Sequence, residues 1–252
     1  MKKPLATLLI SLLSLSTMAA DTHPAFLDTS RPASIKPEFT VHVGVGASTI
    51  TQNYSDQIEG CTEFFLTPGC RTAFGATAGI PIRDWLSINT GIDIAINNFN
   101  YSMTIVDAPN GTLNSIYNRS HYSTLEIPLY VQFRFNLGSK IRWINDLGGY
   151  ISHGMGGSAK YHAYISSTND LGQSQVTESR FSHKYYNAET PLIARTDRTD
   201  YGLHLATGLL YKRHFSLKCV LRAGFPNIAK NLDVLDISTH NVSATFLIGY
   251  TF

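Results

Sequence analysis

The residues of this chain that could take part in catalysis are few, and their spacing matches no known reactive arrangement. Three histidines and two aspartates fall in or near segments with the composition of loops: His183, Asp197, Asp200, His204 and His240. No interval among them fits a metal site or a nucleophile with its base, and small sets of this kind arise by chance in most chains. The sequence therefore predicts that the protein is not an enzyme and holds no metal or cofactor.

A second set of polar residues is more informative, because it lies on one side of segments whose apolar residues alternate. That side is otherwise dominated by Gly, Ser, Thr and Asn. The charged or titratable residues on it are Asp93, Glu126, Arg134, Arg142, Asp146, His204, Lys218 and Arg222. In a narrow barrel these side chains would face a lumen without bulk water, where charges must pair. We expect an internal salt-bridge network that closes the lumen and fixes strand register; a gated ion path is the alternative.

Period-two alternation predicts the strands that would position these residues. It recurs in eight segments: 39–47, 74–82, 86–97, 125–135, 141–151, 201–211, 215–225 and 243–252. Tight turns alternate with long connections, the turns at 82–85, 136–140 and 211–214 and the long connections at 53–69, 104–119, 166–197 and 226–240. This is the pattern of an outer-membrane barrel. We predict an all-β fold, an eight-stranded antiparallel up-and-down transmembrane β-barrel, with the tight turns in the periplasm and four long loops outside.

The composition agrees with a membrane barrel. Charged residues make up 15% of the chain, against about 25% in an average soluble protein. The net charge of +2 leaves no electrostatic footprint for a nucleic-acid partner. The apolar face of the strands is rich in Ile, Leu and Phe, and its exposure is tolerable only under lipid. A secreted, lipocalin-like binding protein, whose strands would also alternate, stays as an alternative.

The two ends of the chain predict export and assembly. Residues 1–20 carry two lysines, an apolar stretch and then small residues, which is the layout of a secretory signal peptide. Residues 21–38 would be a short periplasmic segment, either a free leader or a plug in the lumen, and residues 39–252 the barrel domain. Alternating hydrophobic residues end the chain at Ile248, Tyr250 and Phe252. This ending resembles the signal that the barrel-assembly machinery of Gram-negative bacteria reads during insertion into the outer membrane.

The cysteines predict one crosslink. Cys61 and Cys70 stand close together in "GCTEFFLTPGC", within the first long connection. Outside the cytoplasm two cysteines at this distance, bracketed by Gly and Pro, favour a disulfide that staples the loop. Cys219 falls on the apolar side of its strand, where it is expected to act as a small apolar residue facing lipid.

Several strand-and-turn segments resemble the small outer-membrane β-barrel family of Bacteroidota that includes the PorT-like proteins. The segments are "YSTLEIPLYVQFRF", "GGYIS", "DYGLHLATGLLYKRHFSLKCVLRAGFPNIAKN" and "FLIGYTF". The resemblance implies an outer-membrane barrel and carries no shared catalytic residue or ligand. PorT itself is associated with a secretion system for gliding and surface proteins, and no residue here singles out that role.

Together these features predict a structural or interaction role in the outer membrane. The expected protein is a closed barrel that displays long external loops and docks onto a larger envelope or secretion complex. Its other expected contacts are outer-membrane lipid and, during biogenesis, the barrel-assembly machinery. The leading alternative is a narrow, porin-like channel for small solutes or ions.

Overall fold

Antiparallel strands dominate the part of the chain that the computed structural model describes, residues 26–27, 36–52, 56, 58–107, 110–168, 173–186, 195–230 and 237–252. The predicted signal peptide, residues 1–20, lies outside these residues, as does most of the predicted leader. No helix among the described residues is long and apolar enough to cross a membrane.

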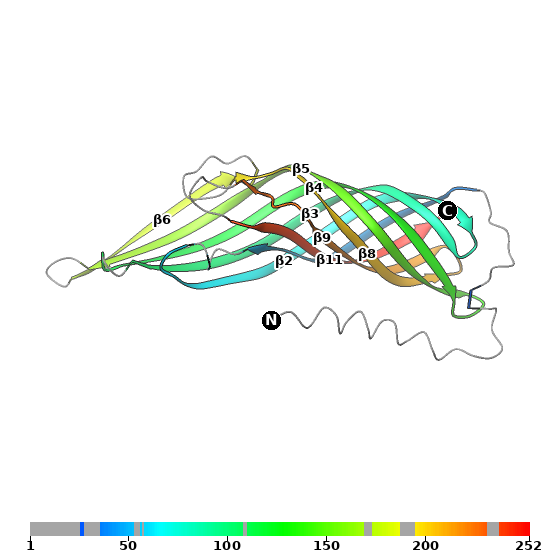
Figure 1. The fold of residues 1–252 in the computed structure, drawn as a ribbon, viewed down its shortest axis with the longest axis horizontal. Helices are drawn as coiled ribbons and strands as arrows, with labels where there is room; N and C mark the ends of the chain where they lie inside the picture. Colours follow the sequence, from blue (N-terminus) through cyan, green and yellow to red (C-terminus); the bar gives the residue numbers. More distant parts are fainter. Residues whose placement is uncertain are drawn as a thin grey trace.

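Eight of the strands close into a ring, as predicted. They are β1 (Glu38–Gln52), β2 (Cys61–Arg83), β3 (Leu86–Asp107), β4 (Thr112–Asn136), β5 (Ile141–Thr168), β8 (Thr199–Tyr211), β9 (Phe215–Gly224) and β11 (Thr239–Thr251). Each pairs antiparallel with its neighbour, and β1 pairs with β11 from Thr40↔Thr251 to Gln52↔Thr239. The fold is therefore an up-and-down antiparallel β-barrel, elongated along its axis (Figure 1).

The outer face of the ring is apolar on every strand. On β1, Val43 and Val45 each expose 60% of their surface, while the alternate residue Gly44 points inward against β11. We call the corresponding outward residues the apolar belt; they include Val41, Val43, Val45, Phe74, Ile80, Ile88, Ile92, Ile96, Ile127, Leu129, Leu147, Ile151, Leu209, Leu217, Leu221, Phe246 and Ile248.

This belt decides the environment of the barrel. A continuous apolar band around a molecule is not left in water, because patches of that size drive association. Lipid covers it instead, and a closed ring meets the requirement that every backbone group inside hydrocarbon be hydrogen-bonded. The protein is an outer-membrane β-barrel, and the belt argues against the lipocalin-like alternative.

Three of the four predicted external loops turn out to be largely strand. β2 begins at Cys61, β3 runs to Asp107, β4 starts at Thr112 and β5 continues to Thr168. A ninth strand of the same sheet, β6 (Ser174–Lys184), pairs with the outer half of β5. It takes the place of β8 there, because the pairing of β8 with β5 ends at His153↔Thr199. We call the outer parts of β2, β3, β4 and β5, together with β6, the external sheet. In Figure 1 it reaches far beyond the ring, at the end opposite the C-terminus.

The predicted disulfide between Cys61 and Cys70 is wrong. Both residues lie on β2, and both are free thiols. Nine residues of extended chain span about 30 Å at ~3.3 Å per residue, whereas disulfide-linked Cα atoms lie about 4.4–6.8 Å apart. Cys219 on β9 pairs with the outward Phe246 and shares its lipid-facing side, as expected.

The inner end of the barrel fixes the first described residues. The backbone N–H of Asn136 donates to the carbonyl of Phe26 at 3.0 Å, and the Phe26 ring stacks on Phe135, an outward residue of β4, with centroids 4.8 Å apart. Phe26, which belongs to the predicted leader, therefore lies at the inner rim of the barrel on the lipid-facing side of the wall. Two further short strands, β7 (Arg195–Thr196) and β10 (Ala229–Lys230), pair with each other near the external end of the barrel.

If lipid covers the belt, a charge there should destabilise the barrel strongly. We expect Val43→Arg to lower the free energy of unfolding by about 2–4 kcal/mol, the cost of a cation near the bilayer midplane. The measurement is urea unfolding in phospholipid vesicles. Val176→Arg is the matched control, because Val176 is 64% exposed on β6 of the external sheet, and it should be nearly neutral. Equal, small effects at both positions would mean that water contacts the belt.

Candidate functional site: the charge clusters of the lumen

Two acidic residues stand side by side on the inner face at mid-height. Asp93 on β3 and Glu126 on β4 are direct cross-strand partners, and both are buried. Two arginines contact them, one from the neighbouring strand β2 and one from β9 across the ring. Arg222 on β9 donates to Asp93 at 2.6 Å and also to Glu126, while Arg71 on β2 donates to Glu126 at 2.7 Å. We call these four residues the central cluster.

Polar neighbours complete the central cluster. His42 Nε2 lies 2.8 Å from Asp93 Oδ1, and Arg222 Nε donates to His204 Nδ1 at 3.1 Å. Arg71 Nε donates to Thr245 Oγ1 at 3.0 Å and Nη1 donates to the side-chain oxygen of Asn97. The central cluster and these neighbours come from seven strands, so the contacts tie opposite walls of the barrel together across the lumen.

A second cluster lies closer to the inner end. Arg134 donates to both carboxylate oxygens of Glu38, at 3.0 and 2.5 Å. Lys218 Nζ lies 2.8 Å from Asp146 Oδ2. Gln132 joins the two pairs, because its amide nitrogen donates to Asp146 at 2.8 Å and its oxygen accepts from Arg134 at 2.9 Å. We call these five residues the lower cluster.

Glycine on the inner face provides the space that the clusters occupy. A Cβ atom on Gly75 of β2 would come within 2.3 Å of Asp93 Oδ1. Higher up, a Cβ on Gly154 of β5 would meet the ring of Tyr186 at 2.2 Å. The Gly-rich polar face that the sequence shows is thus the counterpart of large side chains projecting from the facing or neighbouring strand.

An aromatic group covers the clusters at the outer mouth. Tyr185 and Tyr186, which follow β6, return to the barrel and are buried. Tyr185 stacks on Tyr122 of β4 with ring centroids 4.3 Å apart, and Phe99 of β3 meets Tyr185 edge-on at 6.0 Å. We call Phe99, Tyr122, Tyr185 and Tyr186 the aromatic cap. The sequence did not indicate that Tyr185 and Tyr186 belong to this group, because both lie in a segment that was predicted to be a loop.

Small voids adjoin the central cluster within the part of the chain that the structure describes. Two of them measure about 20 Å³ each. A water molecule needs roughly 10–15 Å³ of such space, so each void accommodates about one water. Polar atoms line both voids, Asp93 and Arg222 among them in the first.

The structure places the predicted lumen residues in three groups. Asp93, Glu126 and Arg222 belong to the central cluster, and His204 contacts it through Arg222. Arg134, Asp146 and Lys218 belong to the lower cluster. Arg142 stands apart, paired with Asp84 at the tight turn between β2 and β3, 2.8 Å away.

Three partners were missed by sequence reasoning, namely Arg71, Glu38 and His42. All three continue the alternation of strands that were predicted. The first residues of β2, up to Gly69 and Cys70, were predicted to be a loop, so Arg71 was not assigned to a strand. Glu38 was assigned to the leader. Extending the predicted alternation by three residues before 74 reaches Arg71, and by one residue before 39 reaches Glu38, while His42 already lay on the polar face.

The histidines and aspartates first considered for catalysis do not assemble. His204 contacts Arg222 of the central cluster, whereas His183 lies on β6. Asp200 accepts from Tyr150 at 3.0 Å and from Asn241 at 2.9 Å, inside the outer half of the barrel. Among the described residues no group of three His, Cys, Asp or Glu side chains is placed to hold a metal ion.

Comparison with known proteins returns no matching family model and no matching curated protein. Among solved structures the chain is similar to Ail, the attachment invasion locus protein of Yersinia pestis, in complex with the heparin analogue sucrose octasulfate; identity is 11%, coverage 86% of this chain and 99% of that chain, and the TM-score 0.37. It is similar to the outer membrane protein OprG of Pseudomonas aeruginosa, with 13% identity, coverage of 85% and 95%, and a TM-score of 0.38. It is also similar to Neisserial surface protein A, with 13% identity, coverage of 85% of this chain and 97% of that chain, and a TM-score of 0.31.

Removing one cation from the central cluster measures how much the pairing of these charges contributes to the free energy of unfolding. We expect Arg222→Ala to lower the free energy of unfolding by about 3–5 kcal/mol, because it leaves the buried Asp93 without an arginine and the buried Glu126 with Arg71 alone. The measurement is urea unfolding in vesicles.

A control and a double variant sharpen this test. Arg213→Ala removes an arginine whose side chain is 62% exposed at the turn after β8, and it should cost less than about 1 kcal/mol. Adding Asp93→Asn to Arg222→Ala should restore part of the loss, since it removes the buried carboxylate that has lost its only arginine, while Glu126 keeps Arg71. If Arg222→Ala were as mild as Arg213→Ala, water would have to reach the central cluster.

Proposed function

We propose that the protein is a closed outer-membrane barrel that passes no solutes and that docks onto a larger envelope complex through its external sheet. The observation that carries the first half is the balance of charge inside. Arg71, Arg222, Arg134 and Lys218 face Asp93, Glu126, Glu38 and Asp146, and every cation lies within hydrogen-bonding distance of a carboxylate. A conducting lumen needs some of these groups free to exchange with a passing ion or water.

The aromatic cap supports the same proposal at the outer mouth. Stacked and edge-on rings fill the opening above the charges, and Tyr186 packs into the space that Gly154 leaves. Two independent kinds of closure, one ionic and one apolar, therefore act in series along the lumen. Such a barrel works as a membrane anchor for whatever its outer part does.

The docking half rests on the open edges of the external sheet. Among the described residues, β6 pairs with β5 along one side only, and β2 between 61 and 68 pairs only with β3. Open edges offer rows of backbone donors and acceptors to which a partner strand can add. Phe65 on β2 and Val176 on β6 expose 63% and 64% of their surface beside these edges, which is apolar area that a protein partner would cover.

The resemblance to PorT-like barrels suggests the class of that partner, a protein-secretion complex of the cell envelope. Membership of the Bacteroidota family is part of this proposal and rests on the sequence segments quoted above. The described residues add no catalytic centre that would favour an enzyme.

A narrow channel for ions or small solutes is the competing candidate. Charged side chains line the lumen over much of its height, as they do in barrels that conduct. This function would require the central cluster and the aromatic cap to rearrange together. The two candidates differ in what a single purified barrel does in a bilayer.

The sealed lumen predicts electrical silence. Refolded wild-type protein, checked by the heat-dependent gel shift of closed barrels, should give no stepwise currents in a planar bilayer. Arg222→Ala and Glu126→Ala, which break the central cluster, should leak, whereas Arg213→Ala should stay silent. Discrete, stable openings in the wild type would favour the channel and overturn the seal.

Docking through the external sheet predicts protein crosslinks from its edges. A photoreactive amino acid placed at Phe65 or Val176 in cells should give a discrete adduct with another envelope protein. The same amino acid at Leu217, which faces lipid on β9 and is 52% exposed, should give none. Adducts with lipid alone at all three positions would contradict docking, whatever the currents show.

A further inference from the structure

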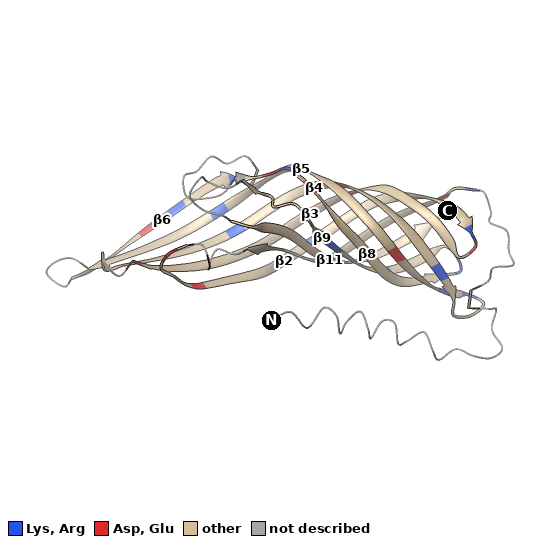
Figure 2. Ribbon diagram, viewed as in Figure 1, with Lys and Arg blue, Asp and Glu red and all other residues tan. Residues whose placement is uncertain are grey.

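Cations gather on the outer face of the external sheet. One register row runs Asn100↔Arg119↔Lys160↔Ser182 across β3, β4, β5 and β6. Beside the row on β3, β4 and β5 lie buried residues that face inward, such as Asn118 next to Arg119, so the row faces outward on these strands. Figure 2 shows Lys and Arg on these strands near β6, with an acidic segment of β6 beside them.

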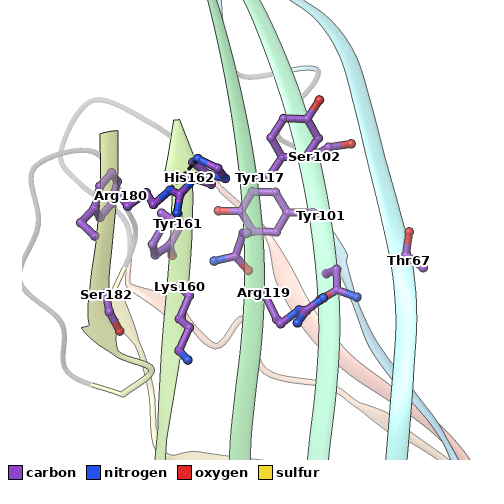
Figure 3. Close-up of a pocket in the computed structure, with 13 residues that line it drawn as sticks. Thr67, Tyr101, Ser102, Tyr117, Arg119, Lys160, Tyr161, His162, Arg180 and Ser182 are labelled. Atoms are coloured by element: carbon purple, nitrogen blue, oxygen red, sulfur yellow. Dashed lines mark hydrogen bonds between the residues drawn. The ribbon is translucent and has the colours of Figure 1, made fainter. Parts of the chain in front are cut away.

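The next row outward adds to the charge and forms a trough. It runs Ser102↔Tyr117↔His162↔Arg180 across the same strands. The two rows together line an open depression of about 860 Å³, and Figure 3 shows their side chains on adjacent strands. We call it the basic trough, defined by Arg119, Lys160, His162, Arg180 and Tyr117.

One carboxylate faces part of the basic trough. Glu178 on β6 accepts from Arg180 Nε at 2.6 Å and lies 2.5 Å from His162 Nε2. Hydrogen bonds from His162 and Arg180 lower the pKa of Glu178, so it stays ionised and balances that end of the trough.

The other end of the trough is unbalanced. Arg119 and Lys160 are direct cross-strand neighbours, and both are exposed on the outer face. Neither makes an ion pair or side-chain hydrogen bond within the part of the chain that the structure describes. Like charges directly opposite each other on a sheet are destabilising. An anion between the two side chains would convert this repulsion into attraction.

The height of the trough above the apolar belt narrows the choice of anion. Ile96 of the belt lies four residues before Asn100 on β3, which is roughly 10 Å of height at ~3.3 Å per residue and a strand tilt of about 40°. The headgroup layer of a phospholipid bilayer is only about 5–7 Å thick on each side. A lipid phosphate at this height therefore belongs to a lipid with a larger headgroup, one in which sugars carry the phosphate.

Tyr117 fits such a headgroup. Its side chain is 53% exposed in the row above Arg119, and it meets Tyr164 edge-on with ring centroids 6.2 Å apart. A ring held in this way presents an apolar face for a sugar beside the cations, and amphipathic aromatics favour the membrane–water interface.

We propose that the basic trough binds the phosphorylated headgroup of a glycolipid in the outer leaflet, with Arg119 and Lys160 holding phosphate and Tyr117 contacting sugar. Arginine supplies parallel N–H donors to two phosphate oxygens, and lysine supplies a point charge. The trough opens sideways on the outer face of the strands, directly above the belt, so the acyl chains of the same lipid can lie against Ile96 and its neighbours. This binding is separate from docking and from closure of the lumen.

Native mass spectrometry of the full barrel in detergent micelles tests the proposal. The probes are bisphosphorylated lipid A, the same lipid with its phosphates removed, and inorganic phosphate. Wild type should retain the phosphorylated lipid. Arg119→Gln combined with Lys160→Gln should bind it at least tenfold more weakly, since two charge-assisted contacts are lost and each tenfold is about 1.4 kcal/mol.

The matched control is Lys212→Gln with Arg213→Gln, which removes an exposed lysine and arginine at the opposite end of the barrel and should bind as wild type does. Lys160→Glu is a second variant that keeps the fold, because it pairs with Arg119; it should also lose the lipid. Equal binding by the double variant, or equal retention of the dephosphorylated lipid, would overturn the proposal. So would displacement of the lipid by millimolar inorganic phosphate, which would indicate a site for free anions.

Discussion

The pairing of β1 with β11 is the constraint on which the rest of this structure depends. Inside hydrocarbon an unpaired backbone group costs several kcal/mol, so the first and last strands of the ring must meet. They do so without a register shift from Thr40↔Thr251 to Gln52↔Thr239. Closing a ring of eight strands leaves an interior only wide enough for side chains. The narrow lumen, its glycines and its paired charges all follow from that closure.

Burial of the charges serves register more than stability. A buried ion pair seldom stabilises a fold beyond what apolar packing would give, but breaking one is costly. In this barrel Arg222 reaches across the lumen to both Asp93 and Glu126. A one-residue slip of β9 would turn Arg222 toward lipid and Leu221 into the lumen. Alternating small and apolar residues alone would permit several registers between neighbouring strands. We infer that the central cluster stabilises only one of them.

Alternation located the ring and most of its inward charges because a bilayer enforces it: each strand must be apolar on one side. Beyond the membrane that rule no longer applies, so β6 and the outer parts of β3 and β4 are polar on much of both faces and resembled loops. The same gap produced the mistaken disulfide, since Cys61 and Cys70 were assigned to a loop that could fold back. The return of Tyr186 into the mouth depends on tertiary contact with Gly154, which no local pattern encodes.

The pleat that builds the belt also builds the basic trough. On β3 the outward residues run from Ile92 and Ile96 in the belt to Asn100 in the trough, without a change of face. Where β6 replaces β8 beside β5, the cylinder opens into a sheet, and its outer face continues the face that touched lipid. A lipid held against the belt therefore has its headgroup delivered to Arg119 and Lys160 by the geometry of the strands. If the lumen is closed as proposed, this outer face and the open strand edges are the surfaces through which the barrel acts.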